Sequence, residues 1–196
     1  MKSRTGLFVI LGIIVILIFW GCSQQRGLAT ADQQVQNAWS NVETNYQRRT
    51  DLYSSVVKTI EGSANFEKST LKDVIDARSK ATSVQVNVND SASLQQYQQA
   101  QAQLQGSFSR LMAVAEAYPD LKTTQAFQNF QTQIEGTENR INVARRDYNA
   151  TVNQYNLKVK LFPNNIFARI LGYPVKPYYK ADVGAEKNPD IQFNIK

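Results

Sequence analysis

The fold is decided by residues 32–60, which read DQQVQNAWSNVETNYQRRTDLYSSVVKTI. Large side chains recur there at alternating spacings of four and three residues: Val35, Trp39, Val42, Tyr46, Arg49, Tyr53, Val56 and Ile60. This spacing places all of them on one stripe of an α-helix of about seven turns. The stretch therefore predicts a long amphipathic helix that buries this stripe against other helices.

The same spacing returns in two later segments, from Leu94 to Tyr118 and from Phe127 to Val159, and a shorter segment runs from Phe66 to Ala81. Three stretches that favour loops separate these segments: Gly62-Ser63, Asn89-Asp90-Ser91 and Pro119-Asp120. We therefore expect an all-α fold, an elongated antiparallel bundle of about four helices.

Residues 163–196 differ from the bundle because they contain Pro163, Gly172, Pro174, Pro177, Gly184 and Pro189. A short helix is expected over Ile166–Leu171, followed by an irregular tail that either packs on the bundle or stays free to bind. The chain thus divides into an N-terminal segment 1–27, a helical bundle 28–162 and a C-terminal tail 163–196.

The N-terminal segment contains an unbroken apolar run, GLFVILGIIVILIFWGC, from Gly6 to Cys22. As a helix it spans about 25 Å, slightly less than the hydrocarbon core of a bilayer. Lys2 and Arg4 precede the run and Arg26 follows it, so the positive-inside rule places the N-terminus in the cytoplasm and the bundle outside.

Two interpretations of this run remain open. In one, it is an uncleaved, single-pass transmembrane anchor. In the other, it is a signal peptide that ends at Cys22, the sole cysteine of the chain, which then carries a lipid. Phe19 and Trp20 are bulkier than the residues that a lipoprotein signal favours before its cysteine. Both interpretations leave the bundle tethered to a membrane.

The composition limits the kinds of active site and metal site that the chain can form. The chain has no histidine and one cysteine among 196 residues. Histidine-dependent nucleophilic triads, histidine metal sites and intramolecular disulfides are therefore excluded. Its polarity comes largely from amides, 20 Gln and 16 Asn, as expected for solvated helix faces. We expect no catalytic, cofactor-binding or metal-binding residues.

Basic residues are concentrated late in the chain. Residues 140–180 hold eight basic residues against one acid, Asp147. One interpretation is a surface that binds anionic lipid or an acidic partner; the other is ion pairing within the bundle, because Arg49 and Arg145 fall on or beside stripe positions. The residues that we consider for an interaction surface are Arg48, Arg49, Arg140, Arg145, Arg146, Tyr178, Tyr179 and Phe193.

Tyrosines occupy stripe positions in all three long segments, and Tyr148-Asn149 recurs one heptad later as Tyr155-Asn156. Buried phenols need hydrogen-bond partners, which amides and arginines can supply. We interpret the tyrosines as part of a polar-decorated core that fixes helix register; the alternative is a pocket with a reactive tyrosine.

Four stretches of the chain resemble the LemA family: NAWSNVETNYQRRTDLYSSVVKTIEGSANFE (Asn37–Glu67), AYPDLKTTQAF (Ala117–Phe127), EGTENRINVARRDYNATVNQYN (Glu135–Asn156) and YYKADVGAEKNPDIQF (Tyr178–Phe193). The last resembles the family's Pro-x-x-x-Phe ending. Asp51-Leu52-Tyr53 departs from the common Asp-Leu-Ile-Pro, so the first helix should be less interrupted. The resemblance implies a bacterial membrane-tethered protein with its helical bundle outside, and it implies no particular activity.

We therefore expect a single-pass or lipid-tethered envelope protein that acts by interaction or scaffolding rather than catalysis. Its expected partners are the membrane, an envelope protein and, alternatively, anionic lipid; nucleic acid is not expected, because the bundle should lie outside the cytoplasm. Two alternative functions remain open: an accessory subunit or enzyme that uses arginine, tyrosine and carboxylate groups at the membrane, and an envelope-remodelling protein that binds anionic lipid. Deletion of residues 173–196 should abolish partner capture and leave helicity intact.

Overall fold

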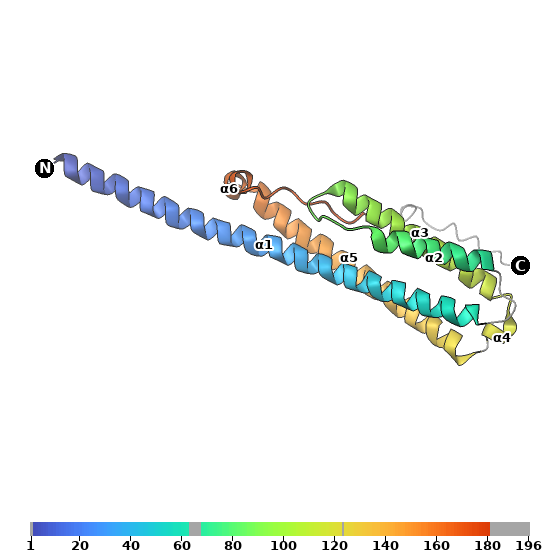
Figure 1. Ribbon diagram of the computed structural model, residues 1–196. Helices are drawn as coiled ribbons and strands as arrows, with labels where there is room; N and C mark the ends of the chain where they lie inside the picture. The colour runs from blue at the N-terminus through green and yellow to red at the C-terminus, as the bar shows by residue number, and fades with distance from the viewer. Residues whose placement is uncertain (1, 63–67, 123, 181–196) are drawn as a thin grey trace, which may run out of the picture.

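The computed structural model describes the backbone of residues 2–62, 68–122 and 124–180, and their side chains except those of residues 2–10, 13–23, 120 and 122. Every regular element of this described part is a helix, which confirms the expected all-α class. The elements are α1 (Lys2–Glu61), α2 (Lys68–Ser83), α3 (Ser91–Ala115), α4 (Pro119–Lys122), α5 (Gln125–Lys160) and α6 (Asn164–Leu171). Figure 1 shows them as an elongated bundle.

Helix α1 is one continuous element of 60 residues, about 90 Å long. It includes the apolar run as well as the predicted stripe, and its N-terminal part projects beyond the other helices (Figure 1). Among the residues searched, which are those that the structure describes, no helix is both long and apolar enough to cross a membrane. Most side chains of the apolar run, including those of Trp20 and Cys22, lie outside the described residues.

Helices α1 and α5 pack antiparallel. Tyr46 of α1 contacts Arg145 of α5, and Tyr53, two turns further along α1, contacts Glu138, which comes earlier in α5. Helix α3 runs parallel to α1: the ring of Tyr46 meets that of Tyr97, and the ring of Tyr53 stacks on that of Phe108 at 3.6 Å. The core of the bundle therefore lies between α1, α3 and α5.

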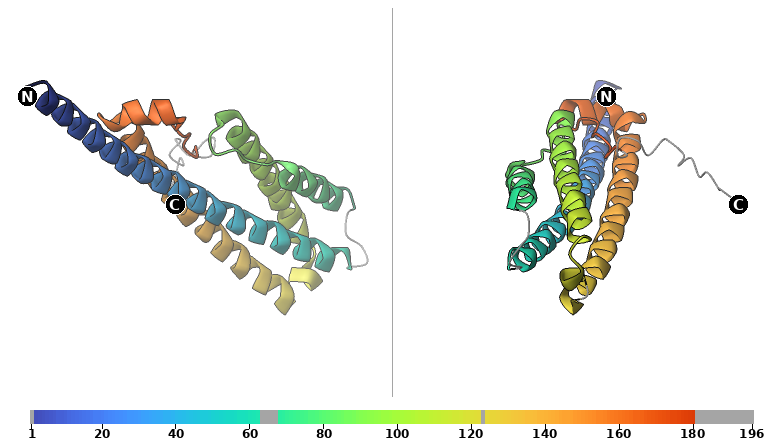
Figure 2. Two further views of the ribbon diagram at one scale, coloured as in Figure 1. Left: turned by 60° about the vertical axis from the view of Figure 1, so that its left-hand side comes forward. Right: turned by 90° about the vertical axis from the view of Figure 1, so that its right-hand side faces the viewer.

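Helix α2 lies beside α1 and α3 and contributes one face to the core (Figure 2). Leu71, Val74, Ala77 and Ala81 form its buried face. They occur at spacings of three and four residues, so only one side of α2 is covered. The short segment predicted between the first two long helices is therefore a helix that covers one edge of the bundle.

The predicted stripes are the buried faces of the long helices. All eight stripe residues of residues 32–60 are buried, Arg49 among them. In α5, Ile141, Ala144, Tyr148 and Val152 are buried, whereas Phe130 and Ile134 are only half-buried. Ile134 borders a surface groove between α3 and α5, so the first turns of α5 are covered on one side only.

Local signals fix the helix ends. The side chain of Asp90 accepts hydrogen bonds from the backbone N–H groups of Ala92 and Ser93, as expected of an N-cap residue. Thr124 caps α5 by accepting from the N–H of Phe127. Gly172 ends α6 with a left-handed φ of 75°, a conformation that glycine adopts without steric cost.

The segment that follows α6 is extended and packs on the bundle. We call residues 172–180 the strap. Lys176 is 1% exposed and Tyr179 is 4% exposed, so the strap contributes to the core. The segment 173–196, whose deletion we expect to leave helicity intact, thus includes residues that are interior. Residues 181–196, which include Phe193, lie outside the described residues.

Candidate functional site

The strap is bound to α5 by two tyrosine–asparagine pairs. The phenol of Tyr155 donates to the carbonyl of Pro174 at 2.9 Å, and the phenol of Tyr148 donates to that of Pro177 at 3.1 Å. Asn156 binds both the N–H and the C=O of Lys176, each at 2.9 Å. Asn149 binds both groups of Tyr179 in the same way, at 2.8 and 2.9 Å. Each pair therefore satisfies three backbone groups of the strap.

The distance between the two tyrosine–asparagine pairs along α5 matches the distance between the strap residues that they bind. Seven residues of α5 rise about 10.5 Å, and three residues of an extended chain rise about 10 Å. The heptad repeat Tyr148/Tyr155 consequently coincides with the three-residue repeat Pro177/Pro174, with the strap antiparallel to α5. Proline has no backbone N–H group, so Pro174 and Pro177 bring no backbone donor that would need a partner.

Lys176 joins the strap to two further parts of the bundle. Its ammonium lies 2.7 Å from the carboxylate of Asp32 on α1 and 2.6 Å from the amide oxygen of Asn89, in the loop between α2 and α3. It also lies 5.0 Å from the centre of the Tyr155 ring. A buried ammonium requires such partners, because its desolvation is costly. The charge of Lys176 is thus used inside the protein.

Tyr179 enters a second cluster with α1 and α5. Its phenol lies 2.6 Å from that of Tyr46, and Arg145 donates to both, at 2.8 Å to Tyr46 and 3.1 Å to Tyr179. The guanidinium also lies 4.5 Å from the centre of the Tyr179 ring. This arrangement combines charge-assisted hydrogen bonds with a cation–π contact.

Arg49 forms a third cluster one turn further along α1. It donates to the side chain of Gln101 on α3 at 2.7 Å and pairs with Glu138 on α5 at 3.4 Å. Its Nε has no hydrogen-bond partner among the described residues, and the guanidinium lies 4.6 Å from the centre of the Tyr46 ring. Arg49 therefore links the three helices of the core.

Burial changes the acid–base properties of the tyrosines. It raises the pKa of Tyr148 to about 12. It raises the pKa values of four further phenols still more: Tyr53, Tyr97, Tyr155 and Tyr179. For Tyr179 the positive charge of Arg145 opposes this effect and does not overcome it. These phenols stay protonated at neutral pH, and those of Tyr53, Tyr148 and Tyr155 donate hydrogen bonds.

The structure separates the arginines and tyrosines considered for an interaction surface. Arg49 and Tyr179 are buried, and Arg145 is half-buried within the cluster above. Four are exposed: Arg48, Arg140, Arg146 and Tyr178. Cys22 lies in α1 with its side chain outside the described range, and Phe193 lies beyond that range altogether.

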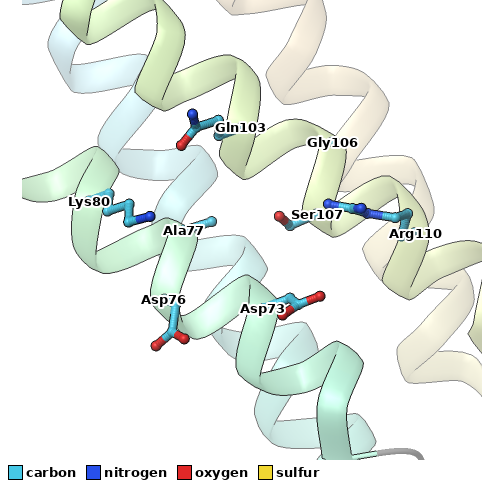
Figure 3. A pocket seen from close by; sticks show the side chains of 8 residues that line it. All are labelled: Asp73, Asp76, Ala77, Lys80, Gln103, Gly106, Ser107 and Arg110. Atoms are coloured by element: carbon cyan, nitrogen blue, oxygen red, sulfur yellow. The ribbon is translucent and has the colours of Figure 1, made fainter.

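Two surface grooves border α3. Figure 3 shows the first, of about 520 Å³, between α2 and α3, where Asp73 and Asp76 lie near Lys80 and Arg110. Its charges of both signs are typical of an exposed helix surface. The second, of about 450 Å³, lies between α3 and α5 and is lined by Phe108, Met112, Ile134 and three glutamates. The sequence stripes did not reveal either groove, since both are bordered by exposed positions.

The fold and these clusters define a class of protein: an elongated helical bundle whose terminal strap is tied into the core by amides and phenols. The sequence model of the LemA family matches residues 38–193, which include most of the bundle and both tyrosine–asparagine pairs. The chain belongs to the LemA family.

The sequence identity to individual relatives is low. Protein LemA of Metamycoplasma hominis is 27% identical over 166 residues, covering 84% of this chain and 73% of the relative. Magnetosome protein MamQ 2 of Paramagnetospirillum magneticum is 26% identical, covering 77% of this chain and 62% of its own length. Magnetosome protein MamQ of Magnetospirillum gryphiswaldense is 23% identical, covering 79% and 64%. This chain therefore spans less than two thirds of either MamQ protein.

Proposed function

We propose that this protein is a membrane-tethered scaffold of the bacterial envelope, which acts by holding a protein partner rather than by catalysis. The observation that carries the proposal is the continuity of α1. One helix contains both the apolar run and the buried stripe of the bundle. A tether on the run would therefore fix the position and the orientation of the whole bundle.

Charge supports the proposed orientation, with the N-terminus in the cytoplasm and the bundle in the periplasm or outside the cell. Lys2 and Arg4 precede the run, and Arg26 alone lies close behind it. Whether the run stays as a single-pass anchor or is cleaved before a lipid-bearing Cys22 is the open detail of the proposal. Mass spectrometry of the mature N-terminus distinguishes the two.

The state of the polar groups supports a binding role. A general base must lose its proton near the working pH, and the buried phenols have raised pKa values. The cations Arg49 and Lys176 are buried and are engaged by side chains of neighbouring elements. These groups are placed to hold the helices together, which leaves the exposed surface for contacts.

For the contact surface we propose the exposed basic residues Arg48, Arg140 and Arg146, together with Tyr178 on the strap. Arg48 and Arg140 lie at a similar height in the bundle, because neighbouring residues Arg49 and Glu138 pair. An acidic protein partner fits these side chains, since guanidinium groups form bidentate bonds with carboxylates.

The tether is tested by extraction of bacterial membranes with alkaline carbonate. We expect the full chain to remain with the membranes and a chain without residues 2–27 to be released. Release of the full chain would contradict the tether. Retention of the shortened chain would assign the attachment to another part of the protein.

The contact surface is tested by placing a photo-crosslinking amino acid in the full chain, in living cells, at Arg140, Arg146 or Tyr178. Ile75 is the matched control, because it is also exposed and lies on α2. We expect one and the same protein adduct from the first three positions and not from Ile75. Adducts of equal yield at all four positions, or at none, would contradict the proposal.

A further inference from the structure

Large apolar side chains are exposed together at one end of the bundle. Leu161 is 60% exposed, Phe162 80%, Ile166 51% and Ile170 75%. These four residues, which we call the end face, follow the last turn of α5 and continue along α6. A monomeric soluble protein normally buries side chains of this kind, so a group of them on the surface indicates a binding surface.

The exposure of the end face follows from the way α6 is held. Ala168 is 2% exposed and packs in the core, and on a helix Ile166 and Ile170 point away from it. The N–H of Tyr173 donates to the carbonyl of Ala168 at 2.9 Å, which closes the last turn of α6. The start of the strap, bound to Tyr155, then fixes the helix in place. The isoleucines are directed outward by the fold.

The end face lies beside the projecting part of α1. Figures 1 and 2 show α6 lying across the end of the bundle from which the N-terminal part of α1 extends. Ala168 and Leu28 belong to one core cluster, and Lys176, five residues after α6, pairs with Asp32, one turn after Leu28. Leu28 comes six residues after Cys22, or about 9 Å along the helix. If a bilayer holds the apolar run, the end face therefore lies at the depth of its headgroups.

The exposed charges on the segment that carries the end face are of one sign. Residues 148–180 contain five basic residues and no acid, and Lys158, Lys160 and Arg169 are exposed. Basic side chains around an apolar helix face are characteristic of helices that lie in the surface of an anionic membrane. An anionic lipid surface therefore matches both the apolar face and the charge beside it.

We propose that the end face inserts into the interface of an anionic phospholipid bilayer and forms a second membrane contact beside the N-terminal run. The proposal deepens the proposed function and rests on its membrane tether. Leu161, Phe162, Ile166 and Ile170 enter the boundary between headgroups and acyl chains, while Lys160 and Arg169 contact lipid phosphates. With two contacts, the bundle is held at a fixed tilt to the membrane.

The test uses the full chain in vesicles of phosphatidylcholine, with or without phosphatidylglycerol. A photo-crosslinking amino acid replaces Ile166 or Ile170, and the matched control replaces Ile75, an exposed isoleucine on α2. We expect lipid adducts at positions 166 and 170, with a higher yield when phosphatidylglycerol is present, and none at position 75. Absence of lipid adducts at 166 and 170, or adducts to a second copy of the chain instead, would overturn the proposal.

The role of charge is tested with Lys160→Glu combined with Arg169→Glu, against Lys72→Glu combined with Lys80→Glu on α2. We expect the first pair to lower the lipid adduct yield at position 170 by at least about fivefold, since each basic residue near an anionic surface contributes attraction. The α2 pair should leave the yield unchanged. Equal yields in the two double variants, with the same thermal midpoint as the parent, would contradict the electrostatic part.

Carbonate extraction of the same vesicles separates this proposal from the tether. A chain that resists extraction but gives no lipid adducts at 166 and 170 refutes the end face alone. A chain that is extracted while its adducts persist supports the end face and refutes the tether.

Discussion

The two ends of the core are built differently. The strap half joins Trp39, Tyr46, Tyr97, Tyr148 and Tyr155 to the strap, and hydrogen-bonded amides, phenols and cations run through it. The α2 half is almost wholly apolar, with Val56, Ile60, Leu104, Phe108 and Leu111 packed against α2. Arg49 lies at the boundary between the two.

This difference teaches how the bundle fixes its geometry. Apolar helix faces accept sequence changes that conserve volume, because dispersion and burial are not directional. Hydrogen bonds to a strap backbone are directional, and a lost partner leaves a buried polar group unsatisfied. The α2 half should therefore respond to changes of volume, and the strap half to changes of geometry.

Removal of the strap should have the largest effect. We expect a chain ending at Gly172 to lose at least about 4 kcal/mol of stability, because the six hydrogen bonds of the two pairs disappear and the Tyr46 and Tyr148 side chains become exposed. Urea unfolding followed by circular dichroism measures this. A chain ending at Lys180 is the control and should lose far less; equal losses would mean that the strap does not stabilise the bundle.

A cavity in the α2 half should have the next largest effect. Leu104 is fully buried, so Leu104→Ala should cost about 3 kcal/mol. Leu104→Met conserves volume and should cost about 1 kcal/mol or less. Both are measured by urea unfolding. Equal costs for the two variants would show that volume does not decide stability in this half.

In the strap half the conservative change should not be tolerated. Asn156→Ala and Asn156→Gln should each cost about 2 kcal/mol, because either leaves the N–H and C=O of Lys176 without their partner. Asn153→Ala is the control, since Asn153 is exposed and its side chain accepts a hydrogen bond from the exposed phenol of Tyr178. If Asn156→Gln is as stable as the parent, stability does not depend on the geometry of the two hydrogen bonds between Asn156 and the backbone of Lys176.

The sequence predicts the α2 half better than the strap half. Spacings of three and four residues identify the buried stripes, including Arg49, since helix periodicity is a local property. The repeat of Tyr148-Asn149 as Tyr155-Asn156 was also visible, and it indicated a polar core. Its partner was not predictable from periodicity, because the strap is extended and the groups that it pairs lie 19 to 30 residues further along the chain. One sequence feature does indicate the pairing. A heptad of α5 is about as long as three residues of an extended chain, which is the spacing of Pro174 and Pro177.

The partners of the buried charged side chains were likewise not predictable from local sequence patterns. Lys176 lies in a proline-containing segment, where a lysine is ordinarily exposed, and its partners Asp32 and Asn89 come from distant parts of the chain. Charge counting placed it in a basic stretch, and only the tertiary fold shows that its charge is interior. By contrast, Lys160 and Arg169 are exposed, so their charges are accessible from solvent.

The smallest expected effect concerns the phenols. Tyr148→Phe removes the hydrogen bond to Pro177 and should cost about 1 kcal/mol near neutral pH. Burial raises the pKa of Tyr148 to about 12, above the value of about 10 in an unfolded chain. The folded state therefore binds the proton more tightly. This contribution to stability is complete below about pH 10 and is lost as the pH rises through about 12.

The cost of Tyr148→Phe should consequently shrink between about pH 8 and about pH 11, because the parent loses stability that the variant never had. Val152→Ala is the control: Val152 is fully buried one turn away and has no proton to lose, so its cost should be the same at both pH values. Urea unfolding of the three chains at the two pH values measures the difference. A cost of Tyr148→Phe that stays constant or grows with pH would mean that folding does not raise the pKa of the Tyr148 phenol.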